Sequence, residues 1–176
     1  MEWPPFYHFP PFFSVQSVKI TKDQQISMWI NFILDFQKYS KKNLIYIEKD
    51  VNSPPFSNPK INRTLSVDFL RLILDELCTR GYGKWQDDEH TVCSTTWKTY
   101  DEWANILYKW AVETSHFRGI CTIYELHSGD ETTDTEFYNL DSSVILIALE
   151  ILEEQGKAKI VKGETADENG VKFYEV

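Results

Sequence analysis

The sequence predicts an α+β protein, mainly helical, with two similar halves behind an aromatic, proline-rich N-terminal segment. Three observations carry this prediction: a gapless internal repeat, amphipathic helical patterns with recognisable caps, and the gathering of proline with aromatic residues near the N-terminus. The 176 residues are 42% hydrophobic and 15% aromatic, which is enough apolar material for a core in each half.

The N-terminal segment is the first element of the prediction. It contains two Pro-Pro-aromatic-aromatic units, Pro4, Pro5, Phe6, Tyr7 and Pro10, Pro11, Phe12, Phe13. Because proline fixes φ at about −65° and biases the preceding residue toward extended backbone, we expect residues 1–17 to form an extended tail. The tail either folds back onto its own domain or places its aromatic rings in pockets of a partner. The duplicated unit favours the partner.

The internal repeat defines the next elements. The stretch LSVDFLRLILDELCTRGYGKWQ, which starts at position 65, aligns without a gap with LDSSVILIALEILEEQGKAKIV, which starts at position 140. Each copy has an N-cap residue (Ser66 or Asp141), an amphipathic run, a glycine typical of a helix C-terminus (Gly81 or Gly156) and a β-prone run. Each copy therefore predicts a helix, a glycine turn and a strand.

The match extends upstream and downstream of the repeat. A helix that begins near Lys22 corresponds to a helix that begins with the capping box Thr99-x-x-Glu102, and β-prone runs follow at 44–47 and 120–123. Two predicted hairpins complete the halves: Lys84–Gln86 with Thr91–Trp97, and Ala158–Lys162 with Val171–Glu175. The order helix, strand, helices, hairpin is that of a winged helix. We therefore predict tandem winged-helix domains over 18–98 and 99–176.

The net charge of −9 is unevenly distributed. Residues 1–98 carry +1 and residues 99–176 carry −10. Winged helices commonly place their third helix in the DNA major groove, but an acidic helix repels phosphate. Use as a protein–protein adaptor is the favoured function, and a winged-helix transcription regulator remains the alternative.

The sequence contains no motif that is typical of catalysis or of cofactor or metal binding. The histidines occur singly, and no zinc-binding or phosphate-binding pattern is present, so we expect no catalytic, cofactor or metal site. The run from His127 to Glu131 is interpreted as a solvated acidic loop. Three widely spaced cysteines indicate reduced thiols in a cytosolic protein, and Glu2 together with the prolines argues against a signal peptide.

Several stretches together resemble a known family. The two PPxY-like units, the paired winged helices and the stretches TIYELHSGDETTDTEF, LDSSVILIALEILEEQGKAKIV and GVKFY are similar to the vacuolar protein sorting-associated protein 25 family, the small subunit of ESCRT-II. The resemblance covers essentially the whole chain. It implies a cytoplasmic, non-catalytic adaptor that is recruited to endosomal membranes for sorting ubiquitinated cargo into multivesicular bodies. It also implies no direct nucleic-acid contact and only indirect membrane contact.

The resemblance also implies partners and binding residues. It implies that two copies of the chain assemble with subunits of the vacuolar protein sorting 22 and 36 types through the eight residues of the Pro-Pro units. It implies that the second winged helix recruits and activates an ESCRT-III subunit of the 20 type. We place part of that surface, as a hypothesis, at Asp130, Glu131, Asp134, Glu136, Glu150 and Glu153.

One alternative concerns the first Pro-Pro unit. PPFY is a full PPxY sequence, which WW domains also bind, whereas the second unit ends in Phe13 and lacks the tyrosine hydroxyl. A ligand of a WW-domain ubiquitin ligase is therefore a second alternative function.

Overall fold

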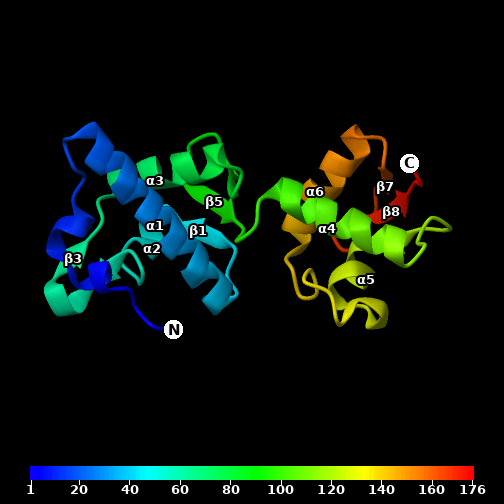
Figure 1. The fold of residues 1–176 in the computed structure, drawn as a ribbon, viewed down its shortest axis with the longest axis horizontal. Helices are drawn as coiled ribbons and strands as arrows, with labels where there is room; N and C mark the ends of the chain where they lie inside the picture. The colour runs from blue at the N-terminus through cyan, green and yellow to red at the C-terminus, as the bar shows by residue number, and fades with distance from the viewer. The chain divides into compact units, whose positions relative to one another are not determined.

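The computed structural model describes all 176 residues as two compact units, Met1–Trp97 and Lys98–Val176 (Figure 1). Each unit combines helices with a small three-stranded antiparallel sheet, in the element order of a winged helix. The predicted α+β, mainly helical class with two tandem winged helices is confirmed. None of the helices combines the length and the apolar character that crossing a membrane would require.

The first unit contains a three-helix layer and a sheet of order β1-β5-β4. A second, two-stranded sheet joins β2 to β3. The helices and strands are α1 (Lys19–Ser40), β1 (Leu44–Tyr46), α2 (Ile47–Asp50), β2 (Ser57–Asn58), β3 (Arg63–Thr64), α3 (Val67–Thr79), β4 (Gly83–Trp85) and β5 (Val92–Thr95), with the 3₁₀ turn η3 (Pro59–Ile61) between β2 and β3.

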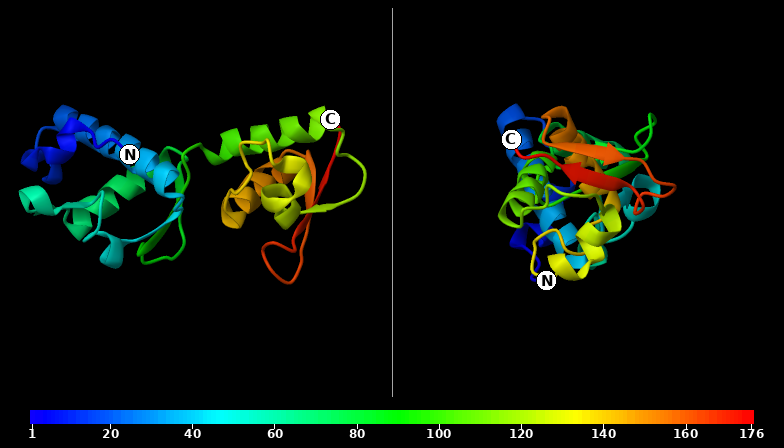
Figure 2. Two further views of the ribbon diagram at one scale, coloured as in Figure 1. Left: turned by 90° about the horizontal axis from the view of Figure 1, so that it is seen from below. Right: turned by 90° about the vertical axis from the view of Figure 1, so that its right-hand side faces the viewer.

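The second unit repeats this arrangement with a sheet of order β6-β8-β7. Its long helices α4 and α6 pack against each other, and β7 and β8 form a hairpin that is clear in the right panel of Figure 2. The elements are α4 (Tyr100–Glu113), β6 (Cys121–Thr122), α5 (Ile123–Ser128), the 3₁₀ turn η4 (Asp130–Thr132), α6 (Ser142–Glu154), β7 (Ala158–Val161) and β8 (Gly170–Phe173).

The caps that the sequence predicts set the ends of these helices. Ser66 Oγ accepts a hydrogen bond from the Phe69 amide at 3.0 Å, and Thr99 Oγ1 accepts one from the Glu102 amide at 3.1 Å. Gly81, after α3, has φ of 90°, a conformation that costs glycine little but strains other residues. The repeat in the sequence is therefore a repeat of local structure.

The tail is not the extended segment that its prolines predicted. It forms two 3₁₀ turns, η1 (Pro5–His8) and η2 (Pro10–Phe13), which close through hydrogen bonds from the Tyr7 amide to the Pro4 carbonyl and from the Phe12 amide to the Phe9 carbonyl, each 3.0 Å long. The fixed φ of proline also suits the first position of a helical turn. Each Pro-Pro pair therefore begins a turn, and the tail belongs to the compact first unit.

The hairpin of β2 and β3 was not predicted from the sequence. Each strand has only two residues, and Ser57 pairs with Thr64 across it. Short polar strands have no hydrophobic alternation, so the pattern that identifies strands is missing here. The hairpin is part of the candidate site because it contacts the tail.

Candidate docking sites

The second Pro-Pro unit is fixed to α1 by an aromatic stack. The ring of Phe12 lies 4.3 Å from that of Trp29 with an interplanar angle of 11°, and Phe13 meets the same indole edge-on at 5.3 Å. All three side chains are buried. Such rings contribute both buried apolar area and favourable ring geometry. The second unit is therefore part of the core of its own domain.

Polar bonds to the tail backbone reinforce this stack. The carbonyl of Phe12 accepts hydrogen bonds from Trp29 Nε1 and from Gln25 Nε2, both at 2.9 Å, and Gln25 Nε2 also donates to the Ser14 carbonyl at 2.7 Å. Gln25 is a buried polar residue on α1. Its amide satisfies carbonyls that the short 3₁₀ turn leaves without partners, which explains a glutamine on a core-facing position.

The first Pro-Pro unit is held by the β2–β3 hairpin through Tyr7. The Tyr7 hydroxyl donates to the Ser57 carbonyl at 2.7 Å, and the Asn58 side-chain amide donates to the Tyr7 carbonyl at 2.8 Å. Burial raises the pKa of Tyr7 above its usual value, so the hydroxyl remains protonated and a donor. Ser57 and Asn58 are residues that sequence reasoning missed, because no local pattern marks a distant partner of the tail.

The opposite face of the tail is open. Phe9, between the two Pro-Pro units, is 58% exposed, and Met28 on α1 is 40% exposed. Two apolar-lined pockets of about 410 and 360 Å³ flank this face, and both Phe6 and Met28 line each of them. Exposed apolar side chains beside concave surfaces are typical of a protein docking site.

The eight predicted tail residues therefore divide into two groups. Tyr7, Phe12 and Phe13 are buried in their own domain, whereas the other five are exposed or half-buried. The three buried rings hold the tail in place. In this conformation they are not available for direct contact with a partner. Phe9, which the motif does not include, is the most exposed aromatic residue of the tail.

The six predicted acidic residues lie in two separate places. Asp130 and Glu131 belong to η4, and Asp134 and Glu136 follow it, whereas Glu150 and Glu153 lie near the C-terminal end of α6. In Figure 1 the end of α6 that leads into β7 and the segment that follows α5 are at opposite edges of the unit. The six carboxylates thus do not form a single patch.

Several of these carboxylates already have partners within the second unit. Glu131 pairs with His116 at 2.9 Å, Glu136 pairs with Lys98 at 3.3 Å, and Glu153 accepts a hydrogen bond from the Ile160 amide at 2.7 Å. A pocket of about 430 Å³ lies beside η4, lined by Asp130 and Glu131 together with apolar side chains from α4, α5 and β8. The lining also includes Glu125 and the basic residues His116 and Arg118, so the pocket combines apolar surface with charged groups of both signs, among which carboxylates are the most numerous.

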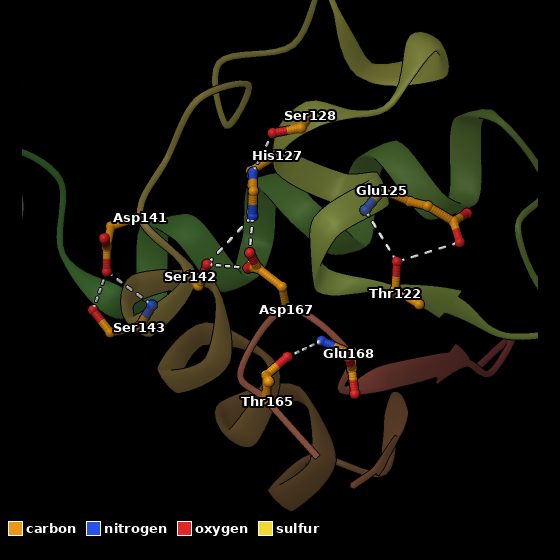
Figure 3. A network of polar contacts seen from close by, with 10 residues as sticks. All are labelled: Thr122, Glu125, His127, Ser128, Asp141, Ser142, Ser143, Thr165, Asp167 and Glu168. Atoms are coloured by element: carbon orange, nitrogen blue, oxygen red, sulfur yellow. Dashed lines mark hydrogen bonds and ion pairs between the residues drawn. The ribbon is translucent and has the colours of Figure 1, made fainter. Parts of the chain in front are cut away.

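The predicted solvated acidic loop contains His127, whose side chain connects several elements of the second unit. His127 Nε2 lies 2.8 Å from an oxygen of Asp167, in the loop between β7 and β8, and Ser142, the first residue of α6, donates to the same carboxylate (Figure 3). His127 Nδ1 contacts Ser128 Oγ at 2.5 Å. The acidic residues of the run are exposed as expected, but the interpretation of the whole run as solvated was wrong for His127.

The cluster of Ser142, His127 and Asp167 has the residue types of a catalytic triad but not its geometry. In a triad, the base contacts the nucleophile through one ring nitrogen and the orienting carboxylate through the other. Here Asp167 and Ser142 both approach Nε2 of His127, at 2.8 and 3.3 Å, and the serine proton is directed to the carboxylate. The cluster instead connects α5, α6 and the loop between β7 and β8.

The same cluster predicts a pH dependence of stability. The hydrogen bond from Ser142, with the nearby His127, holds the pKa of Asp167 below its usual value. Its stabilising contribution is therefore present above the unfolded-state pKa of about 3.9 and is lost as the pH falls through the lower folded-state pKa. We expect Asp167→Asn to lower the free energy of unfolding by about 0.5–1 kcal/mol at neutral pH, since the carboxylate is partly exposed.

Urea unfolding near neutral pH and at about pH 3 measures this difference. The stability gap between wild type and Asp167→Asn should narrow in acid. Asp130→Asn, an exposed carboxylate in the same unit, serves as the matched control and should leave the pH dependence unchanged. An equal gap at both pH values would show that Asp167 does not contribute as described.

The third helices are poorly suited to reading DNA. On α3, Arg80 pairs with Glu76 at 3.0 Å and Arg71 donates to the His90 carbonyl at 3.3 Å. The helix α6 has no lysine or arginine. Because base and phosphate recognition needs free basic side chains, these faces favour contact with protein.

Known proteins match this chain along nearly its whole length. A family model described as "ESCRT-II complex subunit" matches residues 6–141. Proteins named vacuolar protein-sorting-associated protein 25 are similar along their length: the Mus musculus protein is 34% identical over 173 residues, 98% of this chain and 97% of its own. The Xenopus laevis protein is 36% identical over 174 residues, 98% of each chain.

Solved structures show the same likeness. The crystal structure of subunit VPS25 of the endosomal trafficking complex ESCRT-II superposes with a TM-score of 0.81 at 28% identity, covering 96% of this chain and 97% of that one. A chain of the endosomal complex ESCRT-II (VPS22/VPS25/VPS36) superposes with a TM-score of 0.80 at 28% identity, covering 97% and 98%.

The fold and its anchored tail define a tandem winged-helix protein with an aromatic surface built from a folded N-terminal segment. Within that class, the matches over nearly the whole chain are specific. The chain belongs to the ESCRT-II complex subunit family, and the resemblance that its sequence shows to the vacuolar protein sorting-associated protein 25 group is confirmed.

Proposed function

We propose that this chain is a non-catalytic subunit of an ESCRT-II complex and docks through its first unit onto subunits of the vacuolar protein sorting 22 and 36 types. The observation that carries the proposal is the open face of the tail, where Phe9 and Met28 project beside two apolar-lined pockets. The likeness to a chain of the VPS22/VPS25/VPS36 complex supports it. Two copies of the chain per complex are part of the proposal.

The tail acts in this proposal as a preformed surface. Tyr7, Phe12 and Phe13 fix its two turns against α1 and the β2–β3 hairpin. The remaining five motif residues, Pro4, Pro5, Phe6, Pro10 and Pro11, then meet the partner together with Phe9. Because the surface is already ordered, docking loses little conformational entropy.

The double substitution Phe9→Ala/Met28→Ala tests this surface. Both side chains are exposed, so the fold should remain unchanged while affinity for a co-expressed pair of 22-type and 36-type subunits falls by about 10- to 100-fold, as expected for central apolar anchors. Titration calorimetry measures the affinity. Tyr39→Ala, which removes a 62%-exposed aromatic ring elsewhere on α1, is the control. Wild-type affinity in the double variant would refute the proposed surface.

Binding of a WW domain through the PPFY unit is disfavoured in this conformation. Tyr7 is only 5% exposed, and its hydroxyl donates to the Ser57 carbonyl at 2.7 Å. A WW domain recognises its ligand as an exposed, extended segment. The Tyr7 ring would have to leave the core before such a complex formed.

For the second unit, we propose recruitment and activation of an ESCRT-III subunit of the 20 type. The pocket beside η4 supports this role, because it has an apolar lining and three carboxylates, Glu125, Asp130 and Glu131, which outnumber its one arginine, Arg118. Such a lining suits a helix that has both apolar and basic side chains. In this role the chain serves sorting of ubiquitinated cargo into multivesicular bodies. It acts from the cytoplasm and reaches the endosomal membrane through other subunits.

Charge reversal distinguishes the two acidic locations. We expect Asp130→Lys/Asp134→Lys to weaken binding of a 20-type subunit by about 10-fold or more, because both carboxylates are exposed, Asp130 lines the pocket and Asp134 follows it closely in sequence. Glu150→Lys, at the far end of α6, should bind as wild type does. Measurement by fluorescence anisotropy at two salt concentrations adds the expected loss of affinity at higher ionic strength. Weakening by Glu150→Lys alone would move the site to α6.

A further inference from the structure

Two cysteine thiols meet inside the first unit. Cys78, in the last turn of α3, and Cys93, in the middle of β5, are 15 residues apart in sequence, yet their sulfur atoms are 3.6 Å apart. Both cysteines are free; Cys93 is fully buried and Cys78 is half-buried. Cys78 is thus the more accessible residue of the pair.

A glycine in the neighbouring strand makes room for this contact. A Cβ atom on Gly83 of β4 would lie 3.3 Å from Cys78 Sγ and 2.6 Å from a methyl carbon of Leu77. In the sheet, Cys93 pairs with Trp85 of β4 on one side and with Ile45 of β1 on the other. The sheet therefore holds Cys93 against α3, and the absence of a side chain at Gly83 leaves the space that Cys78 uses.

The contact makes the two thiols chemically unequal. A hydrogen bond from the Cys93 thiol lowers the pKa of Cys78, against the opposing effects of burial and of the Asp75 carboxylate. The same shared proton, together with burial, raises the pKa of Cys93. Since the thiolate is the reactive form, the half-buried Cys78 is the nucleophile, and Cys93 is the second thiol that can react with its oxidised form.

We propose that Cys78 and Cys93 form a peroxide-sensitive dithiol that closes to a disulfide between α3 and β5. The general pattern of such sites is an accessible cysteine next to a second thiol that resolves its oxidised form. The sulfurs must approach from 3.6 Å to a bonding distance of about 2 Å, a movement that side-chain rotation and a small backbone adjustment supply.

The oxidation has two balanced steps. The Cys78 thiolate attacks one oxygen of hydrogen peroxide, the O–O bond breaks, and the departing hydroxide takes up a proton to become water, leaving a sulfenic acid. The Cys93 sulfur then attacks the Cys78 sulfur, the S–O bond breaks, and hydroxide leaves as water with the Cys93 proton. In total, two thiols lose two hydrogen atoms and one peroxide becomes two waters.

The test treats the full-length reduced chain with hydrogen peroxide, blocks the remaining thiols and measures intact mass and a peptide map under non-reducing conditions. We expect a loss of two hydrogen atoms, a cross-linked Cys78–Cys93 peptide and reversal by dithiothreitol. Cys121→Ser should react identically. Cys121 is also half-buried, but its pKa is raised by burial to about 11, so it is expected to remain reduced.

Several results of this experiment would contradict the proposed disulfide. Oxygen added to Cys78 without the cross-link would show that Cys93 cannot resolve the sulfenic acid. A cross-link that includes Cys121, or one that forms only between two chains, would assign the reactivity to another thiol. Oxidation of Cys121 before the pair would also overturn the proposal. All of these outcomes are read from the wild-type chain, so none depends on a destabilised variant.

Discussion

Replacing Phe12 by alanine is expected to lower the free energy of unfolding of the first unit by about 3–5 kcal/mol. The Phe12 ring is 5% exposed and stacks on Trp29 at 4.3 Å, so its removal leaves a cavity and an unsupported indole. Hydrogen bonds to the Phe12 carbonyl come from α1 and depend on the same geometry. The whole tail should loosen when the ring is lost.

Urea unfolding followed by tryptophan fluorescence measures this effect on the isolated chain, because Trp29 is the stacking partner. Phe9→Ala is the matched control: it removes the same side chain from a 58%-exposed position in the same tail and should change stability by no more than about 0.5 kcal/mol. If Phe12→Ala changed stability as little as Phe9→Ala, the tail would not be packed in the first unit, and the burial of Phe12 described above would be contradicted.

The second large effect is expected from Phe137→Ala. This ring is fully buried and meets Trp110 edge-on at 5.7 Å, inside the core of the second unit. We expect the second unit to lose about 3–5 kcal/mol of stability. The first unit should keep its own stability, because the core that contains the tail is built from residues of Met1–Trp97.

Amide hydrogen exchange resolved by residue distinguishes the two units in the same sample. In Phe137→Ala, protection should fall in α4 and α6 and remain in α1 and α3. Docking onto the 22-type and 36-type subunits should remain, whereas binding of a 20-type subunit should be lost. An equal loss of protection in α1 would show that the chain unfolds as one cooperative body.

The helix ends were predictable because their signals are local. Ser66, Thr99 and Asp141 cap their helices through bonds to amides two or three residues ahead, and Gly81 and Gly156 adopt the positive φ that ends the helices of the repeat. Each of these helix ends depends on a few neighbouring residues. Because the repeat contains the same signals twice, the order of the elements could be predicted from it.

The conformation of the tail was not predictable in the same way. Proline restricts φ to values that suit both polyproline II and a 3₁₀ turn. The choice between them is made by Trp29, Gln25 and Asn58, which lie 13 to 51 residues away in sequence. The Cys78–Cys93 contact was missed for the same reason, since no spacing rule identifies a helix–strand pair.

The acidic residues show the limit of a charge argument. Summed charge marked residues 99–176 as acidic, but charge alone gave no position. The structure separates Glu150 and Glu153 from the carboxylates near η4, and it shows that Glu131 and Glu136 have basic partners. Only the folded arrangement distinguishes carboxylates that contact a basic side chain from those that do not.

The most direct test of the assembly is the mass of the complex in solution. Multi-angle light scattering of this chain mixed with 22-type and 36-type subunits should give the mass of four chains, with two copies of this one. The Phe9→Ala/Met28→Ala variant should leave a smaller species and free chain, while Tyr39→Ala should assemble fully. A wild-type chain that elutes alone from the mixture would contradict its proposed role as an ESCRT-II subunit.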